Sequence, residues 1–229
     1  MIRLNDQRPF ASGGNRICYR HPAYANRCLK VLRPDRSPAL RRKEKRFPSN
    51  LRPLKYFDEN QVELKVLNYL HANYPKAVRR HLPQSFGMVE TDLGHAHATS
   101  LITNSDGLIS QTLEQYIWEH GLDDTVSQSI EKFKDDWSTQ PPKTRDLIPH
   151  NMVINDLGGE TRLILIDGLG RKPRLTCFYL ACTSRNRYRR RIQDFDQRVQ
   201  RILQRKISNT GPMERLNNLK RKLSETMTS

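Results

Sequence analysis

The residues best suited to chemistry lie in two neighbouring segments, TRDLIPHNMVIND at 144–156 and RLILIDGLG at 162–170. Asp146 precedes Asn151 by five positions, and Asp167 follows an apolar run directly before Gly168. Asn and Asp side chains offer the hard oxygen ligands that magnesium prefers. An acid at the end of an apolar run is costly unless it is paired or binds a metal. We therefore expect Asn151 and Asp167 to be metal ligands, and Asp146 to orient an incoming hydroxyl group or accept its proton.

A second set of candidates lies nearer the start of the chain. Lys30 stands in the apolar run CLKVL, where a rigid strand would let it grip nucleotide phosphates, and Glu63 stands in a helical segment that could orient it. Gly13 and Gly14 precede these residues in a turn that could cradle phosphates or could be a plain turn. Taken alone, Glu63 would be interpreted as an ordinary solvated residue of a helix. A functional role is indicated only by its possible pairing with Lys30.

The order of these parts is that of a phosphoryl-transfer enzyme of the protein-kinase type, which uses ATP and magnesium. A glycine turn is followed by a strand lysine, a helix glutamate, a hinge-like strand, Asp-x4-Asn and a strand ending in Asp-Gly. The catalytic candidates are Asp146, Lys30 and Glu63, and the metal ligands are Asn151 and Asp167. The candidate nucleotide-binding residues are Gly13, Gly14, Lys30 and Ile102.

These side chains need a sheet, a helix and a set of loops to hold them. Residues 8–32 read as a three-strand meander, and 85–92 and 97–103 read as a hairpin whose turn is DLGHA. Residues 58–73 give the clearest helical pattern, with Asp58 as the N-cap. The sequence therefore predicts an α+β fold that begins with an antiparallel five-strand lobe and one helix.

A reduced, mainly helical lobe is expected to follow. Helices are predicted at 111–120, with Gly121 as the C-cap, and at 123–137, before two short strands around the turn DLGG. Residues 33–55 hold four prolines and many cations, and we expect an exposed, partly mobile insertion there. The expected organisation is an N-lobe at 1–104, the hinge, helices and loops of the C-lobe at 105–170, and a basic helical segment at 171–229.

The formal net charge is +16, and residues 171–229 carry sixteen Lys/Arg against four Asp/Glu. A balance this basic favours phosphate-bearing partners, whether nucleotide, nucleic acid or an anionic membrane surface. A helix is expected from RNRYRRR at 185–191 to about residue 205, and a short one at MERLNNLKRKL after the break NTGP.

The sequence also bears on where the chain works. It has no apolar stretch long enough for a membrane span and no signal-peptide core at its start, so we expect a cytoplasmic location. The four cysteines form no C-x-x-C pair and read as free thiols.

Several segments resemble the YrbL family of bacterial proteins, which is named for the PhoP regulatory network and is itself kinase-like. The resemblance spans roughly residues 1–170. It is carried by NRICYRHPAYANRCLKVL, VELKVLNYL, GMVETDLG, SDGLISQTLEQYI, LIPHNMVI and LIDGLG. It implies a protein-kinase-like, two-lobed fold with a nucleotide cleft, and it implies little about the substrate.

The chain departs from the usual kinase pattern at several points. Thr144 replaces the first histidine of the catalytic loop, Leu169 follows Asp167-Gly168, and the glycine turn SGGNRICY lacks a third glycine. Only 62 residues follow Asp167, too few for the usual peptide-binding half of a kinase. A small-molecule acceptor, weak activity and no activity all stay open.

Two hypotheses follow from the sequence. In the first, the chain is an ATP- and magnesium-dependent kinase with an unknown phosphate acceptor. In the second, it is a catalytically inactive regulatory protein on the same scaffold, whose basic C-terminal segment binds an acidic partner, RNA or a membrane surface.

Overall fold

The computed structural model describes residues 1–145, 147–169 and 178–208, apart from the side chains of 178–185. Those residues fall into two compact units. The first unit comprises Met1–Tyr69 and Gln84–Leu101, and the second comprises Leu70–Pro83 and the described residues from Ile102 onward. Residues 70–83 lie within the range predicted for the N-lobe, 1–104, but they are part of the second unit.

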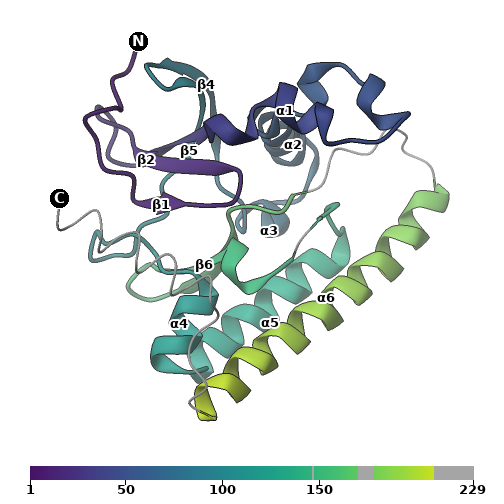
Figure 1. Cartoon of the computed structure of the whole chain (residues 1–229). Coiled ribbons are helices and arrows are strands. Elements are labelled where there is room, and N and C mark those ends of the chain that lie inside the picture. Colours follow the sequence, from purple (N-terminus) through teal and green to yellow (C-terminus); the bar gives the residue numbers. More distant parts are fainter. Residues whose placement is uncertain (146, 170–177, 209–229) are drawn as a thin grey trace. The chain divides into compact units, whose positions relative to one another are not determined.

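The first unit is built on an antiparallel five-stranded sheet with the order β1-β2-β3-β5-β4 (Figure 1). The predicted meander and hairpin supply its strands: β1 (Ala11–Ser12), β2 (Arg16–Arg20), β3 (Arg27–Leu32), β4 (Ser85–Thr91) and β5 (Gly94–Ser100). In the register, Lys30 of β3 lies opposite both Cys18 of β2 and His97 of β5. The predicted α+β fold class with a five-strand first lobe is confirmed.

The β4–β5 hairpin is tighter than predicted. Thr91 pairs directly with Gly94, so the turn has two residues, and β5 begins three positions earlier than expected. The Thr91 hydroxyl donates to the Gly94 carbonyl at 2.6 Å and accepts from the Leu93 backbone N–H at 3.1 Å. The Thr91 side chain therefore stabilises a two-residue turn, which is shorter than the turn DLGHA predicted from the sequence.

The two faces of the sheet differ in chemistry because side chains alternate along a strand. One face carries an apolar core of Leu4, Tyr19, Leu29, Val31, Ala96 and Ala98. Leu4 reaches that core from the N-terminal segment. The Leu4 backbone N–H donates to the Asp92 carboxylate at 2.7 Å, which holds this segment to the β4–β5 hairpin. The opposite face carries the polar side chains that include Lys30 and His97.

The long helix α2 (Glu59–Asn73) covers this polar face. It begins where predicted, because the Asp58 carboxylate accepts from the Gln61 backbone N–H at 3.0 Å. Val66, Leu67 and Leu70 are its buried apolar residues.

The segment before α2 is more regular than predicted. Residues 33–55 are mostly exposed, as expected, but they form helix α1 (Pro38–Lys43) between three 3-10 turns: η1 (Pro34–Arg36), η2 (Ser49–Leu51) and η3 (Leu54–Tyr56). Ser37 caps α1 and proline occupies its first position. A serine N-cap followed by a proline at the first helical position is a common pattern at the start of a helix. The helix was not predicted because the segment has no hydrophobic period.

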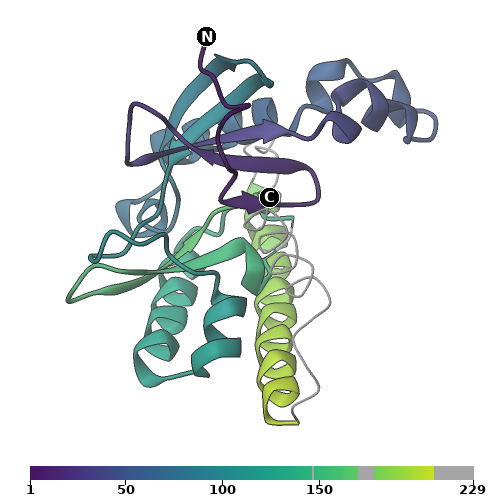
Figure 2. The same cartoon turned by 60° about the vertical axis from the view of Figure 1, so that its left-hand side comes forward.

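The second unit is mainly helical. Its elements are α3 (Lys76–Arg79), α4 (Leu113–His120), α5 (Asp124–Thr139), the 3-10 turn η4 (Pro149–Asn151), β6 (Met152–Asp156), β7 (Thr161–Leu165) and α6 (Phe178–Ile207). Strands β6 and β7 form the predicted antiparallel hairpin, and β7 packs on α5. Helix α6 runs beside α4 and α5 (Figure 2). The predicted short helix in MERLNNLKRKL lies outside the described residues.

The helix boundaries of this unit follow the capping chemistry of the sequence. Thr112 and Gln115 form a capping box at the start of α4, and Gly121 ends it with a φ of +93°.

Among the described residues, no helix combines the length and apolar character needed to cross a bilayer.

Candidate functional site

Lys30 occupies a buried position on β3 and pairs with a glutamate from α2. Its Nζ atom lies 2.8 Å from Oε1 of Glu63, and both side chains are only 8% exposed. A charged lysine loses much of its hydration at such a buried position. The Glu63 carboxylate is therefore needed to compensate the buried positive charge. The structure thus brings together the predicted strand lysine and helix glutamate, which is the arrangement of the β3 lysine and the following helix in protein kinases.

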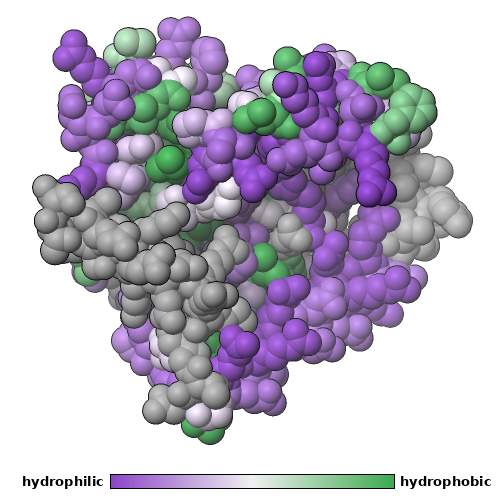
Figure 3. All heavy atoms as spheres, in the orientation of Figure 1, coloured by the Kyte–Doolittle hydropathy of each residue, from purple (hydrophilic) through white to green (hydrophobic). Residues whose placement is uncertain are grey.

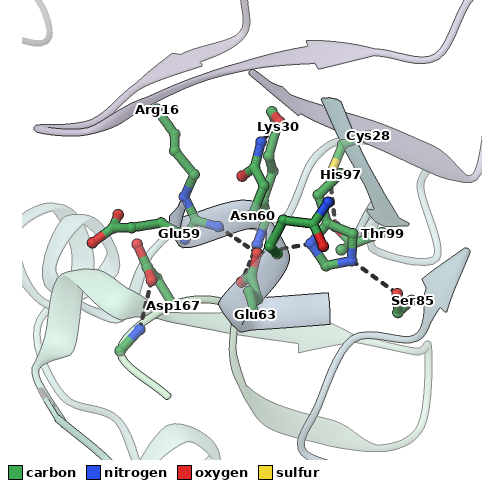
Figure 4. A network of polar contacts seen from close by, with 12 residues as sticks. Arg16, Cys28, Lys30, Glu59, Asn60, Glu63, Ser85, His97, Thr99 and Asp167 are labelled. Carbon is green, nitrogen blue, oxygen red and sulfur yellow. Dashed lines mark hydrogen bonds and ion pairs between the residues drawn. The ribbon is translucent and has the colours of Figure 1, made fainter. Parts of the chain in front are cut away.

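Glu63 has more partners than Lys30, the one predicted from the sequence. Its second oxygen, Oε2, forms an ion pair with Arg16 of β2 and a hydrogen bond with Nδ1 of His97 at 3.0 Å (Figure 4). Three basic side chains from β2, β3 and β5 therefore converge on one carboxylate of the helix.

His97 is completely buried, and its second ring nitrogen is also engaged. Nε2 lies 2.8 Å from the hydroxyl of Ser85 on β4. A carboxylate can only accept, so Nδ1 carries a proton and donates it to Glu63. The contact of Nε2 with the Ser85 hydroxyl ties β4 into the same network.

The charges around Glu63 determine its ionisation. Burial by itself would raise the pKa of the Glu63 carboxyl, but the positive charges of Arg16 and Lys30 and the hydrogen bond from His97 outweigh it. The pKa of Glu63 is held well below its ordinary value of 4.5. The carboxylate is accordingly charged throughout the physiological range.

A second contact anchors the same helix to the same strand. The buried Asn60 amide, one turn before Glu63, donates to the backbone carbonyl of Lys30 at 2.8 Å. Residues three apart on a helix lie on one face, so Asn60 and Glu63 hold both the backbone and the side chain of Lys30.

The glycine turn before β2 does not require glycine for its conformation. Neither Gly13 nor Gly14 has a positive φ, and a methyl group on Gly14 would meet no atom within 4 Å. The Gly13 N–H is used in the turn itself, donating to the Arg16 carbonyl at 2.8 Å. The open space at Gly14 is compatible with close approach of a ligand, and the predicted phosphate role of both residues stays a prediction.

In the second unit, the two predicted metal ligands lie on adjoining segments. The Ile166 N–H, next to Asp167, donates to the Asn151 carbonyl at 2.8 Å. The Asp167 carboxylate accepts from the Gly168 N–H at 2.7 Å, and Gly168 has a φ of +86°, a backbone region that favours glycine. The Asp-Gly pair is therefore a turn that orients the acid.

The loop around the predicted catalytic acid is held to the same turn. The Arg145 N–H donates to the Gly168 carbonyl at 2.7 Å, and Thr144 bridges Leu169. Asp146 itself lies outside the described residues, so its role stays a prediction. On the other side of the loop, His150 pairs with the buried Glu114 of α4 at 3.4 Å.

The donor set is suited to magnesium. An amide oxygen and a carboxylate are hard ligands, and this ion completes its octahedron with water and substrate phosphates. No cluster of three or more His, Cys, Asp or Glu side chains suited to a metal occurs among the described residues. With Asn151 and Asp167 as its protein ligands, such an ion would take its other ligands from water and phosphates, and this metal role stays a prediction.

The remaining predicted residues are also located. Ile102 is the first residue of the second unit after β5, and its carbonyl accepts from the Ser110 N–H at 3.0 Å. Its predicted contact with a nucleotide base stays a prediction. His81 is buried, with its ring nitrogens next to the Leu163 carbonyl at 2.7 Å and the Asp136 carboxylate at 3.1 Å. Cys18 and Cys28 are free thiols.

Sequence reasoning missed Arg16, His97, Ser85 and Asn60 because each looked like an ordinary residue of a strand or helix. A signal for three of them was present. Arg16 is two residues from Cys18 on β2, and His97 is two residues from Thr99 on β5, so the period of two puts each pair on one face, which is the face of Lys30. Asn60 precedes Glu63 by three positions, which places both on one helix face.

Comparison with known proteins gives the family. The family model described as PhoP regulatory network protein YrbL matches residues 2–206. The chain belongs to this family. Two YrbL relatives, named "Uncharacterized protein YrbL" in Escherichia coli (strain K12) and Shigella flexneri, are each 27% identical over 176 residues. That alignment covers 74% of this YrbL-family chain and 74% of each relative.

Solved structures similar to this YrbL-family protein include the kinase domain of Mycobacterium tuberculosis PknI. The TM-score is 0.40 at 16% identity, covering 72% of this chain and 60% of that domain. A point mutant of the same domain gives a TM-score of 0.41 at 14% identity, with 77% and 64% covered. This YrbL-family chain thus spans less than two thirds of the domains it matches.

Proposed function

We propose that this YrbL-family protein binds ATP with magnesium and transfers a phosphoryl group to an acceptor that is still to be identified. The observation that carries the proposal is the buried pair of Lys30 and Glu63, because a lysine fixed in this way on a strand is the phosphate-binding device of kinases. In the first unit, Lys30 would contact the nucleotide phosphates and Glu63 would orient it. Gly13 and Gly14 would border the phosphates.

In the second unit, Asn151 and Asp167 would hold the magnesium ion, which neutralises charge on the phosphates when it is bound. Asp146 would orient the acceptor hydroxyl or take its proton. The hydrogen bonds between the Arg145 and Gly168 backbones and between Ile166 and Asn151 support this assignment, since they join the segments that carry the three residues. Ile102 would contact the base.

Thermal melting of the purified protein with ATP, with and without magnesium, tests the binding part. A ligand at about 100 times its dissociation constant stabilises the native state by about 2.7 kcal/mol. For a chain of this size that corresponds to a rise in Tm of about 5–10 °C. We expect the rise to need magnesium and to be largely lost in Asp167→Asn.

A matched control is Asp156→Asn, which makes the same substitution at an exposed position of the neighbouring hairpin. It should keep the shift seen with the wild type. Equal shifts in wild type and Asp167→Asn would contradict the assignment of Asp167, and no shift in the wild type would contradict nucleotide binding.

Transfer is tested separately with ATP labelled in the γ-phosphate. Turnover that is lost in Asp146→Asn would support the enzyme. Magnesium-dependent binding without turnover by the wild type would instead support the second hypothesis, a regulatory kinase-like protein that senses nucleotide.

A further inference from the structure

Helix α6 carries an apolar stripe that is used inside the second unit. Tyr188, Phe195, Val199 and Ile202 are buried, and the Tyr188 hydroxyl donates to the Lys134 carbonyl of α5 at 2.9 Å. Lys134 in turn pairs with Asp196 of α6 at 2.7 Å. The apolar side of the helix is therefore already covered by its own unit.

A different face of α6 carries a row of exposed cations, which we call the arginine stripe. Its members are Arg187, Arg190, Arg198, Arg201 and Arg205. At 3.6 residues per turn they fall within a sector of about 80° and extend over about 27 Å of the helix. Figure 3 shows the hydrophilic surface along this helix.

The stripe carries an electrostatic cost. Arg187 and Arg190 are three residues apart and so are Arg198 and Arg201, spacings at which like charges destabilise a helix. Among the described residues, no ion pair is formed by any of these four arginines. Asp194 is exposed in the same sector, four residues after Arg190 and four before Arg198, and it offsets part of this repulsion. The stripe still holds five cations against one acid, and we argue that an external anion balances this excess positive charge.

A second row of exposed side chains borders the stripe. Gln193, Gln197, Gln200 and Gln204 occupy the adjacent sector of α6. Neutral amides beside guanidinium groups supply the additional hydrogen bonds that proteins make to phosphate and sugar oxygens. An apolar anchor, which a protein partner would ordinarily need at the centre of an interface, does not occur in the stripe or in this row.

We propose that the arginine stripe binds the phosphate backbone of a nucleic-acid duplex. Guanidinium groups match phosphate oxygens in a two-pronged geometry, and a straight helix suits the fixed row of phosphates of a duplex. A single strand would need exposed aromatic side chains for base stacking, but Tyr188 and Phe195, the aromatic residues of α6 whose side chains the structure describes, are buried. A membrane surface would need an exposed apolar face, and in the part of α6 with described side chains Tyr188, Phe195, Val199 and Ile202 are all buried.

The test measures binding of short fluorescent RNA and DNA duplexes by anisotropy over a range of salt concentrations. One variant changes all five stripe arginines to glutamine. A matched control removes five exposed cations from the first unit, namely Arg42, Lys43, Lys45, Arg46 and Arg52, by the same change to glutamine. Melting and far-ultraviolet circular dichroism of both variants establish that they are folded.

Counterion release predicts that the wild-type affinity falls steeply with salt, with a logarithmic slope of about −4 for five contacts. The stripe variant should lose most of that slope, while the control should keep it. If the stripe variant does not fold, R187Q/R198Q/R205Q should reduce the slope by about 2–3. A preference for the RNA or the DNA duplex would identify the source of the phosphates.

Three results would overturn the proposal. The first is no duplex binding by the wild type at low salt. The second is an equal loss in stripe variant and control, which would mean that net charge alone is responsible. The third is that the stripe variant loses binding to anionic vesicles or to polyglutamate but not to either duplex. Because ATP is absent from this experiment, its outcome is independent of the proposed kinase-like function.

Discussion

The carboxylate of Glu63 accepts from three basic side chains, all of which are buried with it. A buried ion pair often contributes little net stability, because desolvation offsets the attraction, but breaking one leaves costly charges behind. The network around Glu63 is therefore better understood as a device that fixes the position of Lys30 than as a source of stability.

The change Glu63→Gln should be strongly destabilising. It removes the carboxylate that Arg16 and Lys30 share while keeping the size of the side chain, and the expected loss is about 3–5 kcal/mol in the free energy of unfolding. Urea denaturation measures it. A loss below about 1 kcal/mol would show that the network contributes no more than an exposed ion pair.

The same variant should alter the dependence of stability on pH. The native pKa of Glu63 lies below the unfolded value near 4.5, so below that pH the unfolded state binds more protons. Stability due to Glu63 is fully present above about pH 4.5 and is lost as the pH falls toward the native pKa. The difference in unfolding free energy between wild type and Glu63→Gln should therefore narrow on acidification below about pH 4.5, and a constant or widening difference would contradict the assigned charge state.

His97 should matter more than Ser85. His97→Ala removes a hydrogen bond to a buried charge and leaves a cavity, at a cost of about 2–4 kcal/mol. Ser85→Ala removes only the outer hydroxyl, at a cost of about 1 kcal/mol. Thermal and urea denaturation of both variants provide the comparison, and equal losses would contradict a larger contribution from His97 and its contact with Glu63.

At the scale of elements, the first turn of helix α4 is capped by its own side chains and also contacts the loop that carries Asn151, a predicted metal ligand. Thr112 begins the helix in a capping box with Gln115, and Glu114 within its first turn pairs with His150. The position of the loop that carries Asn151 thus depends on how α4 starts.

Thr112→Ala should cost about 1 kcal/mol in unfolding free energy, because the helix loses its side-chain cap. Thr125→Ala is the matched control, since Thr125 is exposed in the first turn of α5 and Asp123 caps that helix. The control should change stability by less than about 0.5 kcal/mol. Equal effects of the two substitutions in chemical denaturation would show that the capping box does not stabilise α4.

At the scale of the molecule, the net charge of +16 sets the response to salt. Repulsion among so many cations destabilises a compact state, and salt screens it. Calorimetry should show a Tm that rises by several degrees between about 0.02 and 0.5 M sodium chloride. The five-glutamine stripe variant, with less charge, should show a smaller rise, and a Tm that falls with salt would show that attractive ion pairs outweigh the repulsion.

Local patterns in the sequence were enough to predict much of this molecule. The strand pattern of RCLKVL, the helical period after Asp58 and the C-cap at Gly121 predicted these elements and the α+β class correctly, because each depends on near neighbours. The family resemblance was confirmed as well. The helix α1 was missed because it lacks a hydrophobic period.

The tertiary structure alone decided which side chains share Glu63. Residues 16, 30, 63 and 97 are distant along the chain, and only the register of β2, β3 and β5 under α2 brings them to one carboxylate. The sequence determined that a lysine and a glutamate were available, since that depends on residue type and local period. The alternation within one strand shows which residues share a face, but the neighbour of each strand and the helix that covers that face are decided by burial and hydrogen bonding between distant segments.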